Sequence, residues 1–130
     1  MKIDLSQYEK LLHEGKLDRV IRGQHGVKGI SIGYARVGPN PKSIKDIIEE
    51  GDIAVVPLVT PADPPYLIEC GGIVTDTGGK ANHAAMLAND LSIPCTIGAR
   101  DATKTLANYT GKLLLYVDHY IGLVYKVKEV

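Results

Sequence analysis

Cysteine is scarce in this sequence, which has two in 130 residues, and long apolar runs are missing from it. Cys70 and Cys95 are too few for a disulfide framework, and neither belongs to a Cys-x-x-Cys pair. No apolar stretch approaches the length of roughly 20 residues that a membrane helix needs, and no charged leader precedes an apolar segment. We therefore expect a cytoplasmic protein without a membrane partner.

An excess of charge of one sign is also missing. Fifteen Lys and Arg residues balance fifteen Asp and Glu residues, and neither sign forms a block. This balance argues against a nucleic-acid partner that is held by charge alone. His13, His25 and His119 are scattered without the spacing of metal ligands, His25 and His119 in segments that read as turns, so no metal site is expected.

The length of the chain fits one domain, residues 1–130, which would bury about two thirds of its unfolded surface. The sequence has no internal repeat and no low-complexity segment. A capping-box pattern over Ser6–Glu9 predicts a helix that Gly15 can end, within an N-terminal helical extension, residues 1–17. The apolar face of this helix is formed by Tyr8, Leu11 and Leu12.

The rest of the chain alternates between strand and helix patterns, which predicts an α/β fold. Glycines punctuate residues 20–37, as in short strands joined by tight turns. Ser43 can cap a helix that runs through Glu50, and Ile53–Leu58 is typical of a strand covered on both faces. Further strands are expected at residues 73–75, 95–97, 113–117 and 120–127, the last two forming a hairpin around Asp118 and His119.

The segment around Gly78 and Gly79 places a histidine where a helix is expected to begin. The glycine pair allows a tight turn, Asn82 is a good N-cap, and apolar residues recur with helical spacing until Pro94 stops the pattern. The free N–H groups of a first helical turn form a seat for an anion. Because imidazole is a nucleophile near neutral pH, His83 beside such a seat suggests a phosphoryl carrier.

Four segments in series carry a family resemblance. They are Gly26–Val37, Gly51–Pro57 with Thr60-Pro61 behind it, Gly72–Gly79 leading to His83, and Leu91–Gly98. Together they resemble the swivelling phosphohistidine domain of the PEP-utilising enzymes, a family that includes phosphoenolpyruvate synthase, pyruvate phosphate dikinase and enzyme I of the sugar phosphotransferase system. The resemblance extends from about Arg22 to the C-terminus and keeps the expected order of segments.

This resemblance implies a swivelling β/β/α fold with the active histidine, His83, at a helix N-terminus. In the family, the domain swings between an ATP-grasp nucleotide domain and a barrel that binds PEP or pyruvate. The chain has no room for either, so both would act in trans as separate proteins. ATP, PEP and Mg²⁺ would then bind to those partners, and this chain would bind no cofactor itself.

The phosphate contacts that we expect are Gly79, Lys80, Asn82 and Thr60. Two of them have an equally ordinary interpretation, because Lys80 suits a solvated surface and a threonine before proline is commonly structural.

Two functions from different classes remain open. A stand-alone phosphocarrier is favoured by the His83-Ala84-Ala85 segment at the expected helix start. A non-catalytic interaction or regulatory module that kept the fold is favoured by the missing companion domains and by two departures from the family pattern. Ala81 replaces the usual Thr or Asn, and Asn89 stands where Arg or Gly is usual.

Overall fold

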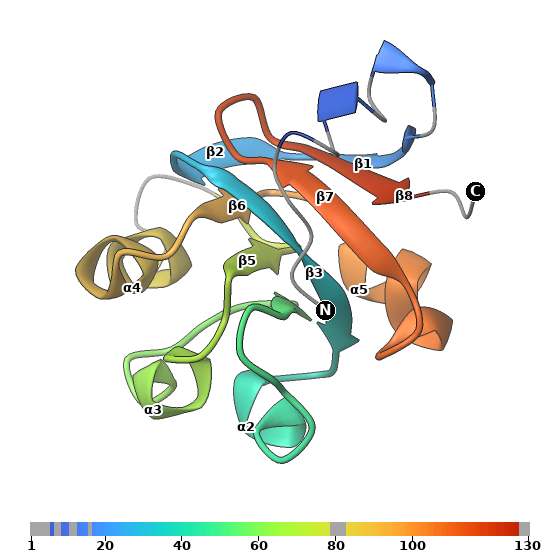
Figure 1. Ribbon diagram of the computed structural model, residues 1–130. Helices are drawn as coiled ribbons and strands as arrows, with labels where there is room; N and C mark the ends of the chain where they lie inside the picture. Colours follow the sequence, from blue (N-terminus) through green and yellow to red (C-terminus); the bar gives the residue numbers. More distant parts are fainter. Residues whose placement is uncertain (1–5, 7–8, 11–12, 16, 79–82, 128–130) are drawn as a thin grey trace.

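The computed structural model describes residues 6, 9–10, 13–15, 17–78 and 83–127. The strands are β1 (Leu17–Arg22), β2 (Gln24–Val27), β3 (Ile30–Val37), β4 (Ile53–Val56), β5 (Gly72–Thr75), β6 (Cys95–Ile97), β7 (Leu114–Asp118) and β8 (Leu123–Val127). The helices with described bounds are α2 (Pro41–Ile44), α3 (Pro64–Leu67), α4 (His83–Leu91), α5 (Ala102–Leu106) and the 3₁₀ turn η1 (Ala107–Tyr109). Figure 1 shows these elements, a mixed α/β arrangement as the sequence predicts.

All eight strands belong to one sheet, in the order β1-β8-β7-β3-β4-β5-β6-β2. Strands β3 to β6 are parallel, whereas β1, β8, β7 and β3 pair antiparallel and β2 pairs antiparallel with β6. The first and last strands in this order, β1 and β2, are separated in sequence only by Gly23. The sheet must therefore curl until its two ends meet at that residue.

Gly23 makes the closure possible because it has no side chain. A Cβ at this position would lie 2.6 Å from the Ile97 carbonyl oxygen and 2.8 Å from a methyl carbon of Thr96. Its own N–H donates to the Gly122 carbonyl at 2.7 Å, in the turn between β7 and β8. Gly23 thus lies where the ends of β1, β2 and β6 meet the turn between β7 and β8.

Two apolar cores form on the two faces of the parallel strands. Within β4, Ala54 and Val56 pack with α4 through Ala84 and Ala88. The alternate residues of β4, Ile53 and Val55, belong to a second cluster that includes Ala102 and Leu106 of α5. Helices α2, α3 and α4 therefore cover one face and α5 the other (Figure 1). The prediction of a strand covered on both faces is confirmed for residues 53–56.

The predicted helix from Ser43 to Glu50 is wrong. The helix observed is α2, a single turn that starts earlier, because Asn40 is its N-cap and accepts a hydrogen bond from the Ser43 backbone N–H at 2.8 Å. Ser43 is therefore the third helical residue, and Pro41 the first. After Ile44 the chain continues in turns, with one helical hydrogen bond from the Ile48 N–H to the Ile44 carbonyl at 3.0 Å, and the helix does not extend to Glu50.

Two other local expectations also fail. Strand β3 runs unbroken through Gly33, where a turn is expected. A Cβ on Gly33 would strike the backbone carbonyl oxygen of Gly51, so this glycine permits a close approach between segments. His25, expected in a turn, lies in β2. The apolar face predicted for the N-terminal helix, formed by Tyr8, Leu11 and Leu12, lies outside the described residues and stays a prediction.

Candidate functional site

The carboxyl ends of the parallel strands bring three loops to one edge of the sheet. The loop after β4 contains Thr60, the loop after β5 begins at Asp76, and the loop after β6 contains Gly98. Parallel α/β sheets, both open and closed, bind their ligands at this edge, outside the carboxyl ends of the strands. The loop that begins at Asp76 leads toward His83, so the sequence-predicted site lies here.

Residues 76–78 are fixed by backbone hydrogen bonds to both neighbouring loops. Thr77 donates its N–H to the Pro57 carbonyl at 3.0 Å and accepts from the Gly98 N–H at 2.8 Å. Gly78 packs against Gly98 so closely that a Cβ on Gly78 would lie 2.9 Å from the Gly98 Cα. The path of the chain toward His83 therefore leaves the sheet from a rigid position.

His83 is the first described residue of α4, and its side chain is exposed. The helix is anchored beneath it, because Ala84 and Ala88 are completely buried in the core. Small residues allow a close approach, and a Cβ on Gly26 would lie 3.3 Å from the Ala85 methyl carbon. An accessible imidazole thus stands on a helix that the core holds in place.

Three of the predicted phosphate contacts, Gly79, Lys80 and Asn82, lie outside the described residues, as does Ala81. Their roles stay predictions.

Thr60 is described, and its hydroxyl has a partner within its own loop. The Thr60 hydroxyl donates to a carboxylate oxygen of Asp63 at 3.1 Å, and the same oxygen accepts the Thr60 N–H at 2.8 Å. Asp63 is buried, with 8% of its surface exposed, so the turn before α3 is held from inside. Thr60 can offer its hydroxyl proton to a phosphate only by giving up the bond to Asp63.

His119 differs from His83 because it is fully buried. Its Nε2 lies 2.7 Å from the Ser31 hydroxyl, and its Nδ1 lies 2.8 Å from the Thr96 hydroxyl. The Ser31 hydroxyl donates its only proton to the Gly71 carbonyl at 2.7 Å, so it must accept from a proton on Nε2. Nδ1 then accepts from Thr96, and the ring is neutral.

Burial lowers the pKa of the His119 imidazole to about 3, opposed in part by a nearby backbone carbonyl of Cys95. This ring links β3, β6 and the segment before β5, so its role is structural.

The two cysteines are free, buried and unreactive. Burial is the main cause that raises the pKa of the Cys70 and Cys95 thiols to about 12, so neither is a thiolate near neutral pH. Cys95 behaves as the small buried hydrophobe that its setting in the sequence predicts. Within the described part of the chain, no three His, Cys, Asp or Glu side chains gather where they could hold a metal ion.

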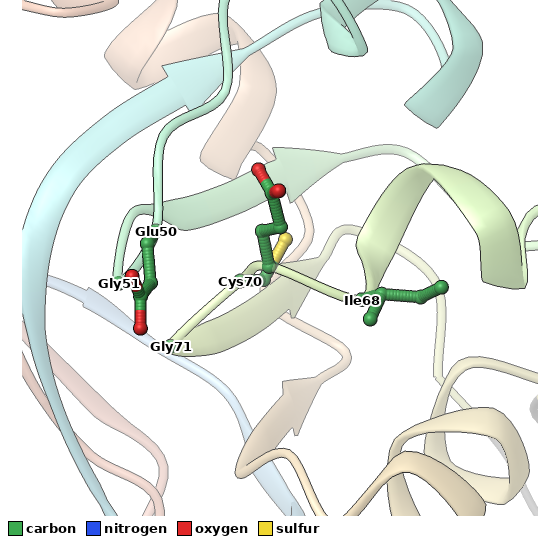
Figure 2. Close-up of a pocket in the computed structure, with 6 residues that line it drawn as sticks. Glu50, Gly51, Ile68, Cys70 and Gly71 are labelled. Atoms are coloured by element: carbon green, nitrogen blue, oxygen red, sulfur yellow. The ribbon is translucent and has the colours of Figure 1, made fainter.

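A pocket of about 380 Å³ lies at the other edge of the sheet (Figure 2). Its lining residues come from the segments before β4 and β5 and from the end of α3: Glu50, Gly51, Ile68, Glu69, Cys70 and Gly71. Because these segments precede the strands, the pocket is on the amino side and takes no part in the His83 site.

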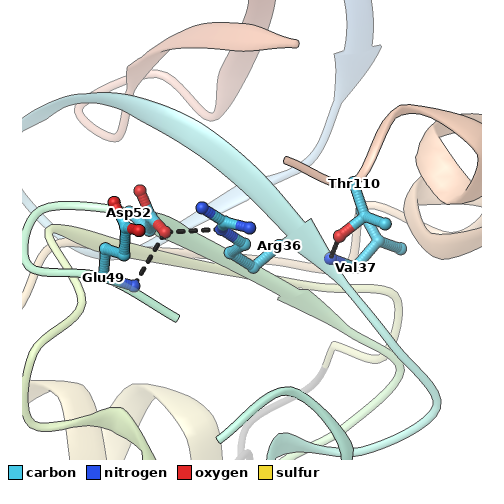
Figure 3. Close-up of polar contacts among 5 residues, drawn as sticks. All are labelled: Arg36, Val37, Glu49, Asp52 and Thr110. Atoms are coloured by element: carbon cyan, nitrogen blue, oxygen red, sulfur yellow. Dashed lines mark hydrogen bonds and ion pairs between the residues drawn. The ribbon is translucent and has the colours of Figure 1, made fainter. Parts of the chain in front are cut away.

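Asp52, beside this pocket, ties the start of β4 to β3 (Figure 3). One of its carboxylate oxygens lies 2.6 Å from Arg36 Nε and also accepts the Glu49 N–H at 2.9 Å. The Asp52 side chain is 6% exposed and that of Arg36 17%. This buried ion pair sets the entry into the central strand and leaves the carboxyl edge free for the site.

Sequence reasoning missed Asp76, whose carboxylate holds the beginning of α5. It also missed Gln24, whose side chain lies beside the loop after β6. A Cβ added to Gly98 would lie 3.4 Å from the Gln24 side-chain amide carbon. Asp76 stands directly before the Thr77-Gly78 approach to the glycine turn, which was the signal available. Nothing in the local sequence around Gln24 marks it.

The fold and this edge define a class: α/β domains whose sheet curls and whose loops gather at the carboxyl ends of the parallel strands. The holo-form of aconitase X from Thermococcus kodakaraensis shares the fold, with a TM-score of 0.58, 15% identity, and coverage of 83% of this chain and 98% of that one. A solution structure of an Enzyme I protein aligns over 64% of this chain and 33% of that chain, with 29% identity and a TM-score of 0.51.

Sequence comparison narrows this class to one family. The family described as "PEP-utilising enzyme, mobile domain" matches residues 48–119. Phosphoenolpyruvate synthase from Pyrococcus furiosus is 38% identical over 107 residues, which cover 82% of this chain and 13% of the relative. The chain therefore belongs to the mobile domains of the PEP-utilising enzymes, as the sequence resemblance indicates. It spans about an eighth of the length of that relative. No helix among the described residues is long and apolar enough to cross a membrane.

Proposed function

We propose that this chain is a swivelling phosphocarrier that accepts a phosphoryl group on His83. The observation that supports this most is the exposed imidazole of His83 on a core-anchored helix, in a chain that belongs to the mobile-domain family. In this proposal His83 stands at the N-terminus of α4, and the N–H groups of the first turn face the phosphate. Gly79, Lys80 and Asn82 complete the phosphate seat.

The transfer needs little covalent help from the protein. A lone pair on the neutral ring nitrogen attacks phosphorus, the N–P bond forms, and the bond to the leaving group breaks as that group takes the electron pair. The contribution of the protein is to position the ring and to offset the charge of the phosphate. An exposed ring on a fixed helix suits a group that must enter the active site of another protein.

The partners in this proposal are an ATP-grasp protein and a PEP- or pyruvate-binding barrel protein that act in trans. ATP, PEP and Mg²⁺ bind to those partners. The chain covers 13% of the phosphoenolpyruvate synthase that it resembles, which leaves room in that relative for the other domains. No nucleic acid is required, in keeping with the balanced charge of the chain.

Chemical phosphorylation tests the acceptor without any partner. The purified chain is treated with potassium phosphoramidate, and its intact mass is measured before and after mild acid. We expect one acid-labile phosphoryl group, located on His83 by fragment masses, and none at that position in His83→Ala. The control is His25→Ala, which removes an exposed histidine of β2 and should leave the labelling of His83 unchanged. Equal total labelling of the wild type and His83→Ala would refute the assignment.

A non-catalytic module of the same fold is the second candidate. The Thr60–Asp63 hydrogen bond favours it, because that bond occupies a hydroxyl that a phosphocarrier would present to the phosphate. Ala81 and Asn89, the two departures from the family pattern, point the same way. Incubation with ATP-grasp and barrel proteins whose genes lie beside the gene for this chain, plus ATP or PEP, separates the two candidate functions. Only a carrier gains a phosphoryl group from them.

A further inference from the structure

We propose that Asp76 is the positioning residue of the loop that carries His83. It clamps the start of that loop to the beginning of α5, on the opposite face of the sheet. This proposal rests on the phosphocarrier function, which it deepens.

Asp76 is held through both its backbone and its side chain. Its N–H donates to the Val56 carbonyl at 3.3 Å, and its carbonyl accepts the Arg100 N–H at 3.0 Å. One carboxylate oxygen accepts the Thr103 N–H at 3.0 Å, and the other accepts the Thr103 hydroxyl at 2.5 Å. Four hydrogen bonds therefore connect this residue to the end of β4, to the loop after β6 and to α5.

The carboxylate of Asp76 does the work of a helix cap. Asp101 occupies the N-cap position of α5, yet its side chain makes no capping hydrogen bond. The N–H of Thr103, the second helical residue, is satisfied by Asp76 instead, 27 residues earlier in the chain. The negative charge also lies near the positive end of a helix, where it is favourable. Helix α5 and the phosphoacceptor loop therefore stabilise each other.

This clamp fixes the position from which the loop leaves the sheet. Thr77 follows Asp76 and is bonded to the loops on both sides, and Gly78 packs against Gly98. At the far end, α4 is anchored by buried Ala84. The two supports lie on opposite faces of the sheet, because α4 packs in one core cluster and α5 in the other. Loss of the Asp76 clamp frees one end of the loop while the helix that bears His83 stays in place.

Paired variants separate positioning from general stability. Asp76→Ala removes both acceptors, whereas Asp76→Asn keeps an oxygen for the Thr103 N–H and has an NH₂ group that can donate to the Thr103 hydroxyl. Thr103→Val removes the hydroxyl donor, and Thr103→Ser keeps it. Leu106→Val is the matched control, because it weakens the packing of α5, where Leu106 is 1% exposed, without touching the clamp.

Two measurements are made on each variant: the rate of His83 phosphorylation by potassium phosphoramidate, and the hydrogen exchange of the Thr77, Gly98 and Arg100 amides. In the phosphorylation reaction, an imidazole nitrogen of His83 forms a bond to phosphorus. The N–P bond of phosphoramidate breaks, and ammonia leaves with the electron pair. We expect Asp76→Ala to slow phosphorylation at least fivefold and to speed exchange of the three amides at least tenfold. Asp76→Asn and Thr103→Ser should stay within about twofold of the wild type, Thr103→Val should fall between, and Leu106→Val should leave phosphorylation unchanged.

Unchanged exchange of the three amides in Asp76→Ala would overturn the clamp. Equal slowing of phosphorylation by Leu106→Val, or none by Asp76→Ala, would overturn its role in positioning His83. Failure of the wild type to take up a phosphoryl group on His83 would instead refute the phosphocarrier function, and the exchange data would then decide on the clamp alone.

Discussion

Lowering the pH from 7.5 to 5 should destabilise this protein through His119. The ring is buried, and both of its nitrogens are occupied, with Nε2 donating to Ser31 and Nδ1 accepting from Thr96. A second proton on Nδ1 would face a hydroxyl hydrogen and would place a charge in the core. The unfolded chain, in contrast, accepts that proton near the ordinary histidine pKa of about 6.5.

The sign and the size follow from this difference in pKa. Burial lowers the folded pKa of His119 to about 3, so below about pH 6.5 the unfolded state binds more protons than the folded state. The stabilisation by neutral His119 is complete above about pH 6.5 and is lost progressively as the pH falls toward about 3. Between pH 7.5 and 5 the loss amounts to about 2 kcal/mol. That figure is nearly the same for any folded pKa below about 4.

Denaturant unfolding of the wild type and of His119→Gln, each at both pH values, provides the test. His119→Gln should be less stable at pH 7.5, because it cannot reproduce both hydrogen bonds, but its unfolding free energy should fall by about 2 kcal/mol less on acidification. The other histidines are present in both proteins, so their contributions cancel in the comparison. An equal loss of stability in the two proteins would refute the argument that His119 is buried in its neutral form.

The remaining predictions concern the Arg36–Asp52 ion pair, the closure of the sheet at Gly23, the loop before His83 and the activity of the isolated chain. Asp52→Asn should cost about 2–3 kcal/mol in denaturant unfolding, below the range for a fully buried pair because Arg36 keeps 17% exposure; a loss under about 0.5 kcal/mol would contradict this. Gly23→Ala should lower the unfolding midpoint strongly, since its Cβ would lie 2.6 Å from the Ile97 carbonyl oxygen, and a wild-type melting curve would show that the closure can relax. Ala81→Thr should make phosphorylated His83 form faster or last longer, by about tenfold or more, if the hydroxyl bonds the phosphate; equal rates would mean a different phosphate seat. The purified chain alone should neither hydrolyse ATP nor consume PEP in a coupled assay, and steady turnover would overturn the carrier proposal.

Patterns local in sequence predicted most of the strands. The apolar residues of β4 and the hairpin of β7 and β8 follow from hydrophobicity alone, and the structure confirms them. Gly33 was misleading because glycine serves both turns and close approaches, and only the neighbouring Gly51 carbonyl shows which applies. Ser43 and Asn40 are both residue types that favour the N-cap position, and only the structure shows that Asn40 holds it.

The candidate site was predictable only where its residues are neighbours in sequence. His83 stands out because the glycine turn and the helix pattern adjoin it. Asp76 does not, because its partner Thr103 is 27 residues away and only the fold brings the two together. The local sequence shows His119 only as a turn residue. Its structural role is not visible there, because its hydroxyl partners, Ser31 and Thr96, belong to distant strands.

The curled sheet has a consequence for synthesis on the ribosome. Leu17 pairs with Val127, so β1 finds its partner strand, β8, only after all the other strands of the sheet have been made. Until then Ile21 and the inner face of the sheet lack the Val124 side chain that packs with them. Contacts this distant in sequence close slowly and leave strand edges open to wrong partners. The nascent chain therefore stays vulnerable to misassembly until the hairpin of β7 and β8 has left the exit tunnel.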